Sequence, residues 1–526
     1  MTDAPLPSFA PPDPREQRMP SLLGIDSGLT VTKAVIFDEC GRSLAVSRER
    51  VPQSLPRAHH VERDMDELWR ATARAIREAI RQSGRGAADI AAVAPTAHGD
   101  GLYLVDRTAS PLGPGILSLD SRARLLLREW QNTGVMEPAL KISGQQPHVA
   151  APSTLLAWIR DHHPERYTRI GHVLGCKDWL RLCLTGELGM DRTEASTAFT
   201  DVSTQSYSSE LLELFGLGAL QRALPPMYEP VAISGQVTAA AAAATGLLAG
   251  TPVAAGLHDV TASALGIGAH APDILGIVAG TYSINEVVSN TPVIDSRWFC
   301  RGAVRPGQWN NMAISPASAT NYDWFIDTLC ASDRDAAAAS GLSIHEQLSP
   351  EIAAGLARPA SPFYHPYLYG SPDGAIASAG FLGLRGWHQR GDMLAAILEG
   401  IAFNHRVHVD ALREAFPATE IYLTGGISRN PLIAQLFSDV LGLPVTVTDT
   451  EEAAAWGAAL CAGAAVGLFK DVAADPRVMS GMRTKFWPDP QARAVRDERY
   501  KLHQQIAHHL RSDWEALSAL EPSKQL

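Results

Sequence analysis

The 526-residue sequence lacks several short motifs that would each assign a function directly. It has no GxxxxGK[ST] segment, which excludes a P-loop, and no GxGxxG segment to support a dinucleotide-binding fold. It also has no HExxH segment and no close grouping of His and Asp, as a metal hydrolase would need. A nucleotide, if this chain binds one, must be held by another kind of turn.

The six cysteines are scattered, and no CxxC pair occurs among them. They predict neither a zinc ribbon nor the disulfide framework of a secreted protein. No run approaches the roughly 20 uninterrupted apolar residues of a membrane span. The proline-rich segment 1–19 lacks the apolar core of a secretory signal peptide. We therefore expect a flexible N-terminal tail, reduced thiols, a cytoplasmic location and no membrane partner.

Positive charge is also in short supply, because 45 Lys and Arg residues face 56 Asp and Glu residues, for a net charge of −11. No long basic stripe is present to exchange for phosphate counterions, so nucleic acid is not expected as a partner. Apolar residues make up 46% of the chain and charged residues 19%, an ordinary globular composition. This length allows two or three domains, so a site in a cleft between lobes is expected.

The chain opens with three short apolar or β-branched runs, at residues 22–26, 32–38 and 43–51, which predict a β-meander. Apolar spacing predicts a helix over residues 65–80. The pattern of strand, glycine turn and strand returns at residues 274–288. We therefore predict an α/β protein with two lobes of related architecture. The predicted divisions are a tail at 1–19, lobes at 20–265 and 266–490, and a C-terminal helix and tail at 491–526.

The first candidate site is the turn after the first predicted strand, where Asp26 stands at the strand end and Gly28 follows. Successive backbone N–H groups in such a turn can form a nest for phosphate, and the carboxylate can hold Mg²⁺ through water. An ordinary hairpin with a solvated Asp fits the same residues.

A second candidate turn, segment 424–430 (TGGISRN), precedes a predicted helix over residues 432–441. Its glycines would let a flat adenine ring lie against the backbone, and the helix N-terminus adds positive potential. A tight turn without a ligand is the alternative. The small residues of segment 452–459 favour the binding site, because they would let a second helix pack close to this turn.

These segments and several others resemble the FGGY carbohydrate kinases over residues 22–469. The most specific match is a C-terminal signature, in which segment 380–384 (GFLGL) is followed after seven residues by segment 392–399 (DMLAAILE). Several motifs in the family's order are stronger evidence than any one of them. The resemblance implies two actin-like, ribonuclease-H-like domains with a cleft between them. Further matching segments are 120–122 (DSR), 177–180 (KDWL), 184–187 (LTGE) and 193–196 (TEAS).

The resemblance implies that Asp259, in segment 256–260 (GLHDV), is the catalytic base of an ATP-dependent kinase. An alcohol is a poor nucleophile, and a positioned carboxylate can remove its proton late in phosphoryl transfer. A buried Asp that only caps the following helix is the alternative. His258 is interpreted as packing beside this base.

The resemblance also implies a site for ATP and Mg²⁺, with Asp26 on the magnesium side, acting through water. The first turn departs from the family's D-x-G-T-[TS]-[SN] pattern, because Leu29 and Val31 replace possible hydroxyl donors. Backbone N–H groups would then have to hold the phosphates. The residues implied beside the phosphates are Gly28, Thr30, Gly280 and Thr281, and those beside adenosine are Gly425, Gly426 and Asn430.

The turn that contains His98, Gly99 and Asp100 stands where the family presents residues to sugar hydroxyls. A short carboxylate accepts hydrogen bonds from hydroxyls and repels an acidic sugar, so we expect Asp100 to select a neutral substrate. His98 is interpreted as a hydroxyl contact, whereas His148 fits a hydroxyl contact and a structural role equally. Asn321 is expected to reach the cleft from the second lobe.

The predicted reaction is ATP-dependent phosphorylation of a terminal hydroxyl on a small neutral sugar or sugar alcohol. Segments 99–101, 176–179 and 193–196 look most like erythritol kinases, and the layout of residues 115–118 and 147–158 looks equally like L-xylulose kinases. Erythritol is the first choice, and L-xylulose or a related ketopentose is the second. A non-catalytic, actin-like ATP-binding sugar sensor is the alternative from another class. The oligomeric state stays open, with a homodimer as one option.

Overall fold

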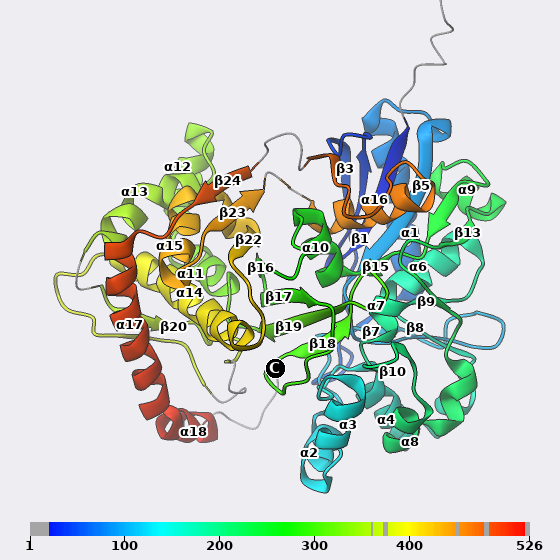
Figure 1. The fold of residues 1–526 in the computed structure, drawn as a ribbon, viewed down its shortest axis with the longest axis horizontal. Helices are drawn as coiled ribbons and strands as arrows, with labels where there is room; N and C mark the ends of the chain where they lie inside the picture. The colour runs from blue at the N-terminus through cyan, green and yellow to red at the C-terminus, as the bar shows by residue number, and fades with distance from the viewer. Residues whose placement is uncertain are drawn as a thin grey trace, which may run out of the picture.

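The computed structural model of the protein describes residues 20–358, 361–371, 377–448, 450, 452–477 and 483–520. Figure 1 shows two lobes side by side, each with its own set of β-strands. The lobe that contains β1 holds the N-terminal part of the chain, and the lobe that contains β22 holds most of the C-terminal part.

The first lobe is built on a sheet in the order β13-β14-β5-β1-β2-β3, with β15 paired to the end of β5. β1, β2 and β3 form the predicted antiparallel meander, and β5 and β14 continue the sheet in parallel. The central strand is buried on both faces, as a strand in a covered sheet must be. The strands are β1 (Ser21–Ser27), β2 (Val31–Phe37), β3 (Ser43–Arg50), β5 (Ile90–Ala97), β13 (Ile233–Gln236), β14 (Pro252–Ala254) and β15 (Leu257–His258).

The second sheet, in the order β18-β19-β17-β16-β22-β23-β24, repeats this arrangement. From β19 to β24 the neighbouring pairs are antiparallel, antiparallel, parallel, parallel and antiparallel. The succession from β3 to β13 is the same. The predicted α/β class with two lobes of related architecture is therefore confirmed. The strands are β16 (Ile274–Ala279), β17 (Ser283–Ser289), β18 (Phe299–Gly302), β19 (Trp309–Ser315), β22 (Glu420–Thr424), β23 (Val445–Thr448) and β24 (Arg483–Phe486).

Helix α1 (Met65–Ser83) shows how the sequence sets these elements. The Asp64 side chain caps its N-terminus by accepting from Glu67 N at 2.7 Å, and Gly84 ends it in a left-handed conformation. Its apolar face is buried in one core with the strands of the first sheet. Three shorter helices also belong to the first lobe: η1 (Ala87–Asp89), α6 (Cys176–Thr185) and α9 (Ala239–Thr245).

Residues between β5 and β13 add a smaller α/β layer with its own apolar core, centred on Leu155, Leu156 and Leu211. Its helices are α2 (Arg124–Thr133), α3 (Met136–Ser143), α4 (Pro152–His162), α5 (Pro164–Thr168), α7 (Arg192–Ala195), α8 (Ser209–Leu214) and η2 (Gly218–Ala223). Its short strands are β6 (Tyr103–Val105), β7 (Gly115–Ile116), β8 (His172–Leu174), β9 (Met190–Asp191), β10 (Thr200–Asp201), β11 (Ser206–Tyr207) and β12 (Met227–Tyr228). The earlier strand β4 (Glu62–Arg63) pairs with β7.

The second lobe surrounds its sheet with longer helices, and α14 runs through its core. Across the described ranges, no helix is both long enough and apolar enough to cross a membrane. The helices are α11 (Thr320–Leu329), α12 (Ala331–Ser340), α13 (Ile344–Leu356), α14 (Arg390–Ala415), η3 (Gly426–Arg429), α15 (Pro431–Leu441), α17 (Pro490–His509) and α18 (Arg511–Leu520), and a hairpin of β20 (Phe363–His365) and β21 (Gly380–Leu382) lies beside them.

Two helices pack at the junction of the lobes, α10 (Asp259–Ile267) and α16 (Ala453–Ala465). α16 stands between β23 and β24 of the second lobe in the chain but packs against the first sheet, where its alanines share a core with Leu22 and Val35 (Figure 1). The small residues allow this approach, because a Cβ at Gly457 would lie 2.0 Å from the Ala262 carbonyl oxygen on α10. The segment 452–459 is therefore small because two helix backbones meet there.

Candidate active site

Three neighbouring strands of the first lobe end at the same edge of the sheet. Asp26 on β1 pairs with Thr96 on β5, and Thr96 pairs with Leu257 on β15, all in parallel. The Thr96 hydroxyl donates to the Leu257 carbonyl at 2.7 Å and fixes the last pair. Ligands of α/β proteins collect at such carboxyl ends. The ends of these strands and the segments directly after them carry the predicted residues Asp26, Gly28, Thr30, His98, Gly99, Asp100 and Asp259.

Asp259 is the first residue of α10, and 31% of its side chain is exposed. Burial is the main cause that raises its pKa to about 7, and the negative charge of Asp26 adds to the effect. The Val260 N–H donates to Oδ1 at 2.8 Å and opposes the rise. A carboxylate with a pKa near neutrality that still reaches solvent can accept a proton at physiological pH.

His258 packs beside this carboxylate, with Nδ1 3.5 Å from Asp259 Oδ1. Burial and the neighbouring Arg301 lower the pKa of His258 to about 4, so its ring is neutral. The Nε2 edge of the ring lies against Gly99, where a Cβ would be only 1.7 Å from His258 Nε2. A glycine is therefore required at position 99 by this contact.

Asp100 adopts a left-handed backbone conformation with φ 56°. Its Oδ1 lies 3.1 Å from Nη2 of Arg301 and 3.3 Å from Nε2 of His148. Burial alone would raise the pKa of Asp100, but Arg301 and His148 hold it well below its usual range. Asp100 and His148 thus lie together in the structure. The charge of Asp100 is compensated, which removes the basis for expecting repulsion of an acidic sugar.

Arg301 was not predicted from the sequence, although it connects the two lobes at this site. It lies on β18 of the second lobe with only 2% of its side chain exposed. Its Nε donates to Gln145 Oε1 at 2.8 Å, and its guanidinium lies over the Phe299 ring at 4.8 Å. The one available signal was an arginine between the two buried residues Cys300 and Gly302 of a strand.

His98 is brought to the same edge, but its ring is held inside the first lobe. Its Nε2 lies 3.1 Å from the Tyr103 hydroxyl and its Nδ1 3.4 Å from the Gly99 carbonyl. Burial lowers the pKa of His98 to about 3, so it stays neutral. Only 4% of the residue is exposed, so these contacts hold the turn of residues 98–100 from the interior of the lobe.

Asn321 lies on α11, within the core of the second lobe, and is fully buried. Its Oδ1 accepts from the Tyr364 hydroxyl at 3.2 Å, and its Nδ2 donates to the Ser318 carbonyl at 3.2 Å. These partners do not include the residues around Asp259. In the structure, the Asn321 side chain therefore bonds groups of the second lobe and does not reach the site around Asp259.

On the predicted nucleotide side, Asp26 faces Lys33 on β2, with 3.5 Å between Oδ2 and Nζ. Lys33 Nζ lies 2.9 Å from Glu452 Oε2, at the start of α16, and Arg48 pairs with the other oxygen of Glu452. Burial raises the pKa of Asp26, and Lys33 opposes the rise. Lys33 and Glu452 were not singled out in the sequence, because residues so far apart give no local pattern.

The two glycine turns of the second lobe adjoin one another at the ends of β16 and β22. Gly425 has φ 114°, and a Cβ there would lie 2.2 Å from the Ala279 carbonyl oxygen, just before Gly280. In front of Gly426, by contrast, a Cβ would meet nothing within 4 Å. Thr281 is exposed beside them. Open space over two adjoining backbone turns fits a flat ligand group.

Asn430 ends this turn and caps α15. Its Oδ1 accepts from Leu432 N at 3.0 Å, and its Nδ2 donates to Ser349 Oγ at 2.9 Å. Both ends of the side chain thus have structural partners, and Asn430 sets the entry of the helix whose N-terminus faces the turn.

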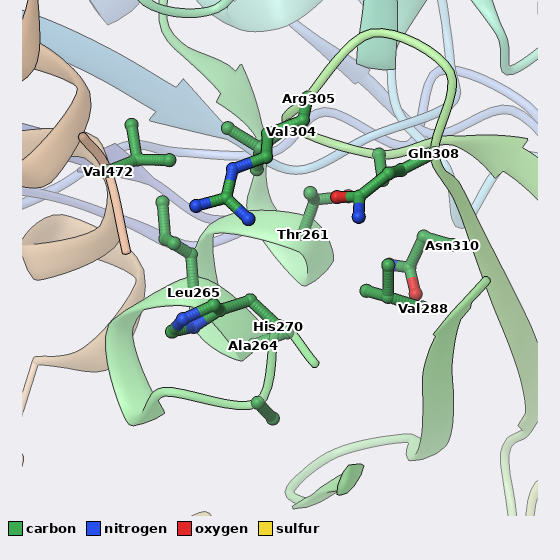
Figure 2. A pocket seen from close by; sticks show the side chains of 12 residues that line it. Thr261, Ala264, Leu265, His270, Val288, Val304, Arg305, Gln308, Asn310 and Val472 are labelled. Atoms are coloured by element: carbon green, nitrogen blue, oxygen red, sulfur yellow. The ribbon is translucent and has the colours of Figure 1, made fainter. Parts of the chain in front are cut away.

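A separate small cavity lies along the side of α10, and Figure 2 shows Thr261, His270 and Arg305 around it. Its volume is about 20 Å³, which is room for one or two water molecules. Its lining includes Asn310 of β19 and none of the predicted site residues.

Comparison with known proteins accounts for this arrangement. The model of the FGGY family of carbohydrate kinases, N-terminal domain, matches residues 21–266, and the model of its C-terminal domain matches residues 275–466. The chain belongs to the FGGY family of carbohydrate kinases. It is therefore an ATP-dependent carbohydrate kinase with the two-domain actin-like fold, as its sequence motifs predict.

Among FGGY relatives, a protein named as a probable L-xylulose kinase from Pasteurella multocida is 34% identical over 93% of this chain and 99% of its own. The L-xylulose/3-keto-L-gulonate kinase of Escherichia coli is 32% identical over 92% and 96%. The erythritol kinase of Brucella abortus is 30% identical over 85% and 87%. A crystal structure of xylulose kinase from Rhodospirillum rubrum matches with TM-score 0.82 and 26% identity over 94% of this chain and 99% of its own.

Proposed function

We propose that this FGGY kinase transfers the γ-phosphoryl group of ATP to a terminal hydroxyl of a ketopentose, with L-xylulose as the first candidate. The relatives named for L-xylulose are more similar over a larger share of the chain than the erythritol kinase. They favour the second choice of the sequence analysis over erythritol. The geometry that carries the proposal is the partly exposed Asp259 carboxylate at the common end of β1, β5 and β15.

In this proposal the sugar hydroxyl oxygen attacks the γ-phosphorus as the bond to the bridging oxygen of ADP breaks. The hydroxyl proton passes to the Asp259 carboxylate, so the products are ADP and a sugar phosphate. Asp100 and His148 would accept or donate hydrogen bonds to the other hydroxyls of the sugar, with Arg301 holding Asp100 in place.

The nucleotide would lie across the turns of both lobes, with its phosphates near Gly28, Thr30, Gly280 and Thr281 and its adenosine over Gly425 and Gly426. Within the described part of the chain, no three His, Cys, Asp or Glu side chains are grouped to hold a metal unaided. A Mg²⁺ ion would thus be held mainly by phosphates and water, with Asp26 as an outer ligand. It would neutralise charge on the phosphates.

The substrate assay would measure ADP release with L-xylulose, D-xylulose, D-ribulose, erythritol and 3-keto-L-gulonate under the same conditions. We expect the highest kcat/KM for L-xylulose. A higher kcat/KM for erythritol would restore the first choice of the sequence analysis. A higher value for the keto-acid would show that the compensated charge of Asp100 does not exclude a substrate carboxylate.

The catalytic role would be tested with Asp259→Ala and Asp259→Asn. Loss of turnover with retained ATP binding is expected, because the proposed role of Asp259 is to accept the proton of the sugar hydroxyl and not to hold the nucleotide. A different result would be a wild-type protein that binds ATP and phosphorylates no sugar, while sugar binding changes only the conformation of the protein. In that case the sensor alternative would replace the proposal.

A further inference from the structure

Behind the base lies a buried group of ionisable side chains that does not face the nucleotide turns. Lys177 Nζ, at the start of α6, lies 2.5 Å from Asp178 Oδ1 and 2.7 Å from Asp191 Oδ1. The side chains of all three residues are fully buried. Burying such charges rarely adds net stability, because desolvation offsets their attraction. This cluster is therefore better explained by a role in fixing the positions of the segments that it joins.

One member of the cluster is connected to the segment that carries the base. Thr193 Oγ1 lies 2.6 Å from Asp191 Oδ2, and His258 N donates to the same Thr193 oxygen at 2.9 Å. Both Thr193 and His258 are buried. His258 is the residue immediately before α10, so its N–H lies one residue from Asp259.

The direction of each hydrogen bond in this chain is fixed. A carboxylate can only accept and a backbone N–H can only donate, so the Thr193 hydroxyl must donate to Asp191 and accept from His258. Lys177 in turn holds the second oxygen of Asp191. The hydroxyl therefore has a single orientation, and the contact cannot rearrange without leaving a buried polar group without a partner.

We propose that Thr193, oriented by Asp191 and Lys177, is a positioning residue for the base, because it fixes the backbone at His258 from which the Asp259 side chain projects. This inference rests on the proposed role of Asp259 and applies to whichever sugar the enzyme phosphorylates. The cap residues of α7 thereby become part of the catalytic geometry. The sugar contacts at Asp100 and His148 belong to other segments and should be unaffected.

The test compares Thr193→Val with Thr193→Ser in the full-length enzyme. Valine keeps the shape of threonine but has no hydroxyl, whereas serine retains the hydroxyl that bonds both partners. We expect Thr193→Val to lower the single-turnover rate of phosphoryl transfer about 10- to 100-fold with little change in the KM for the sugar. Thr193→Ser should recover most of that rate.

A matched control is Thr245→Val, because Thr245 is also buried and its hydroxyl also has two hydrogen-bond partners, which here are both backbone groups. Its hydroxyl donates to the Ala241 carbonyl at 2.7 Å and accepts from Leu247 N at 3.2 Å, at the end of α9. This variant should lose stability but keep the wild-type rate. Thermal melting of all variants would show which fraction is folded, and rates would be expressed per folded enzyme.

The inference is overturned if folded Thr193→Val transfers phosphate at the wild-type rate, or if its KM rises while its single-turnover rate is unchanged. It is also overturned if Thr193→Ser is as slow as Thr193→Val. Failure of the proposed function is a different result: the wild-type enzyme itself would show no transfer, or Asp259→Ala would transfer at the wild-type rate.

Discussion

Arg301 of the second lobe binds Asp100 of the first lobe, with 3.1 Å between Nη2 and Oδ1. The arginine side chain is 2% exposed and the aspartate side chain 17% exposed, so this is a largely desolvated ion pair at the boundary of two domains. Removal of one partner from such a pair leaves the other charge unpaired. The proposed sugar site is therefore completed only when β18 lies against the turn that contains Asp100.

Arg301→Gln should weaken sugar binding much more than ATP binding. Asp100 would keep His148 as a neighbour but lose the permanent positive charge of Arg301. The turn that contains Asp100 would then lose its fixed shape. We expect the KM for the sugar to rise about 10- to 100-fold and the KM for ATP to change less than about threefold. Steady-state kinetics with each substrate varied in turn would measure this.

Arg297→Gln is a suitable control for that experiment, because Arg297 pairs with Asp295 and Glu414 at the surface of the same segment. Exposed pairs contribute little, so this variant should keep the wild-type KM values. Equal effects of the two substitutions would contradict a specific role for Arg301.

The activity should depend on pH through the ionisation of Asp259. The base works only as a carboxylate, and burial and Asp26 raise its pKa to about 7, so kcat/KM should rise as the pH increases through that value. Asp26→Asn removes a negative charge that raises this pKa. The acid limb of the pH profile, measured on the residual activity of the variant, should therefore shift to lower pH. Identical acid limbs for the wild-type enzyme and the variant would show that Asp26 does not act on the base.

Local patterns predicted the parts of the site that follow strands. Asp26 and Asp259 stand directly after apolar strand segments, and parallel strands bring their ends to one edge, so sequence alone placed both carboxylates in one lobe. The repeated strand and glycine-turn pattern likewise predicted two related sheets. The family resemblance then supplied roles that spacing could not.

Contacts between distant segments could not be predicted in this way. Arg301 is 201 residues from Asp100, and Glu452 is 419 residues from Lys33, so only the folded chain shows that they pair. The polar groups of His98 and Asn321 look available to a ligand in a turn or a helix, because a local pattern does not show which side chains pack against them. In the fold, Tyr103 and Tyr364 contact them instead.

Gly457→Ala on α16 should destabilise the protein although alanine is the better helix former. In an open helix the substitution would stabilise by about 0.5–1 kcal/mol. Here the added Cβ would be 2.0 Å from the Ala262 carbonyl oxygen, a backbone atom of α10, so a helix backbone would have to shift. We expect a net loss of about 1–3 kcal/mol in the free energy of unfolding.

Urea denaturation would measure this loss, with Gly386→Ala as the control, since a Cβ there meets nothing within 4 Å. The control should change the free energy of unfolding by less than about 0.5 kcal/mol. A stabilised Gly457→Ala variant would contradict the close packing of α10 on α16.

Glu286→Gln should change how the stability of the enzyme depends on pH. Glu286 is 1% exposed on β17, and its Oε2 accepts from Asn310 Nδ2 at 2.5 Å. Burial raises its pKa from 4.5 to about 8, and the charge of Asp259 adds to the rise. The folded state therefore holds a proton that the unfolded state has released. The free energy of unfolding falls as the pH rises from 4.5 to about 8.

Glutamine stays neutral at every pH, so Glu286→Gln lacks this contribution. Each pKa unit corresponds to about 1.4 kcal/mol, so the wild-type enzyme should lose a few kcal/mol more than the variant between pH 5 and 8. Urea unfolding of both proteins at several pH values would measure the difference. Asp259 titrates over its own range in both proteins, so the comparison measures the contribution of Glu286 together with its interaction with Asp259. If the two curves ran parallel from pH 5 to 8, Glu286 would already be ionised in the folded enzyme, and its contact with Asn310 would have to be a bond to a carboxylate.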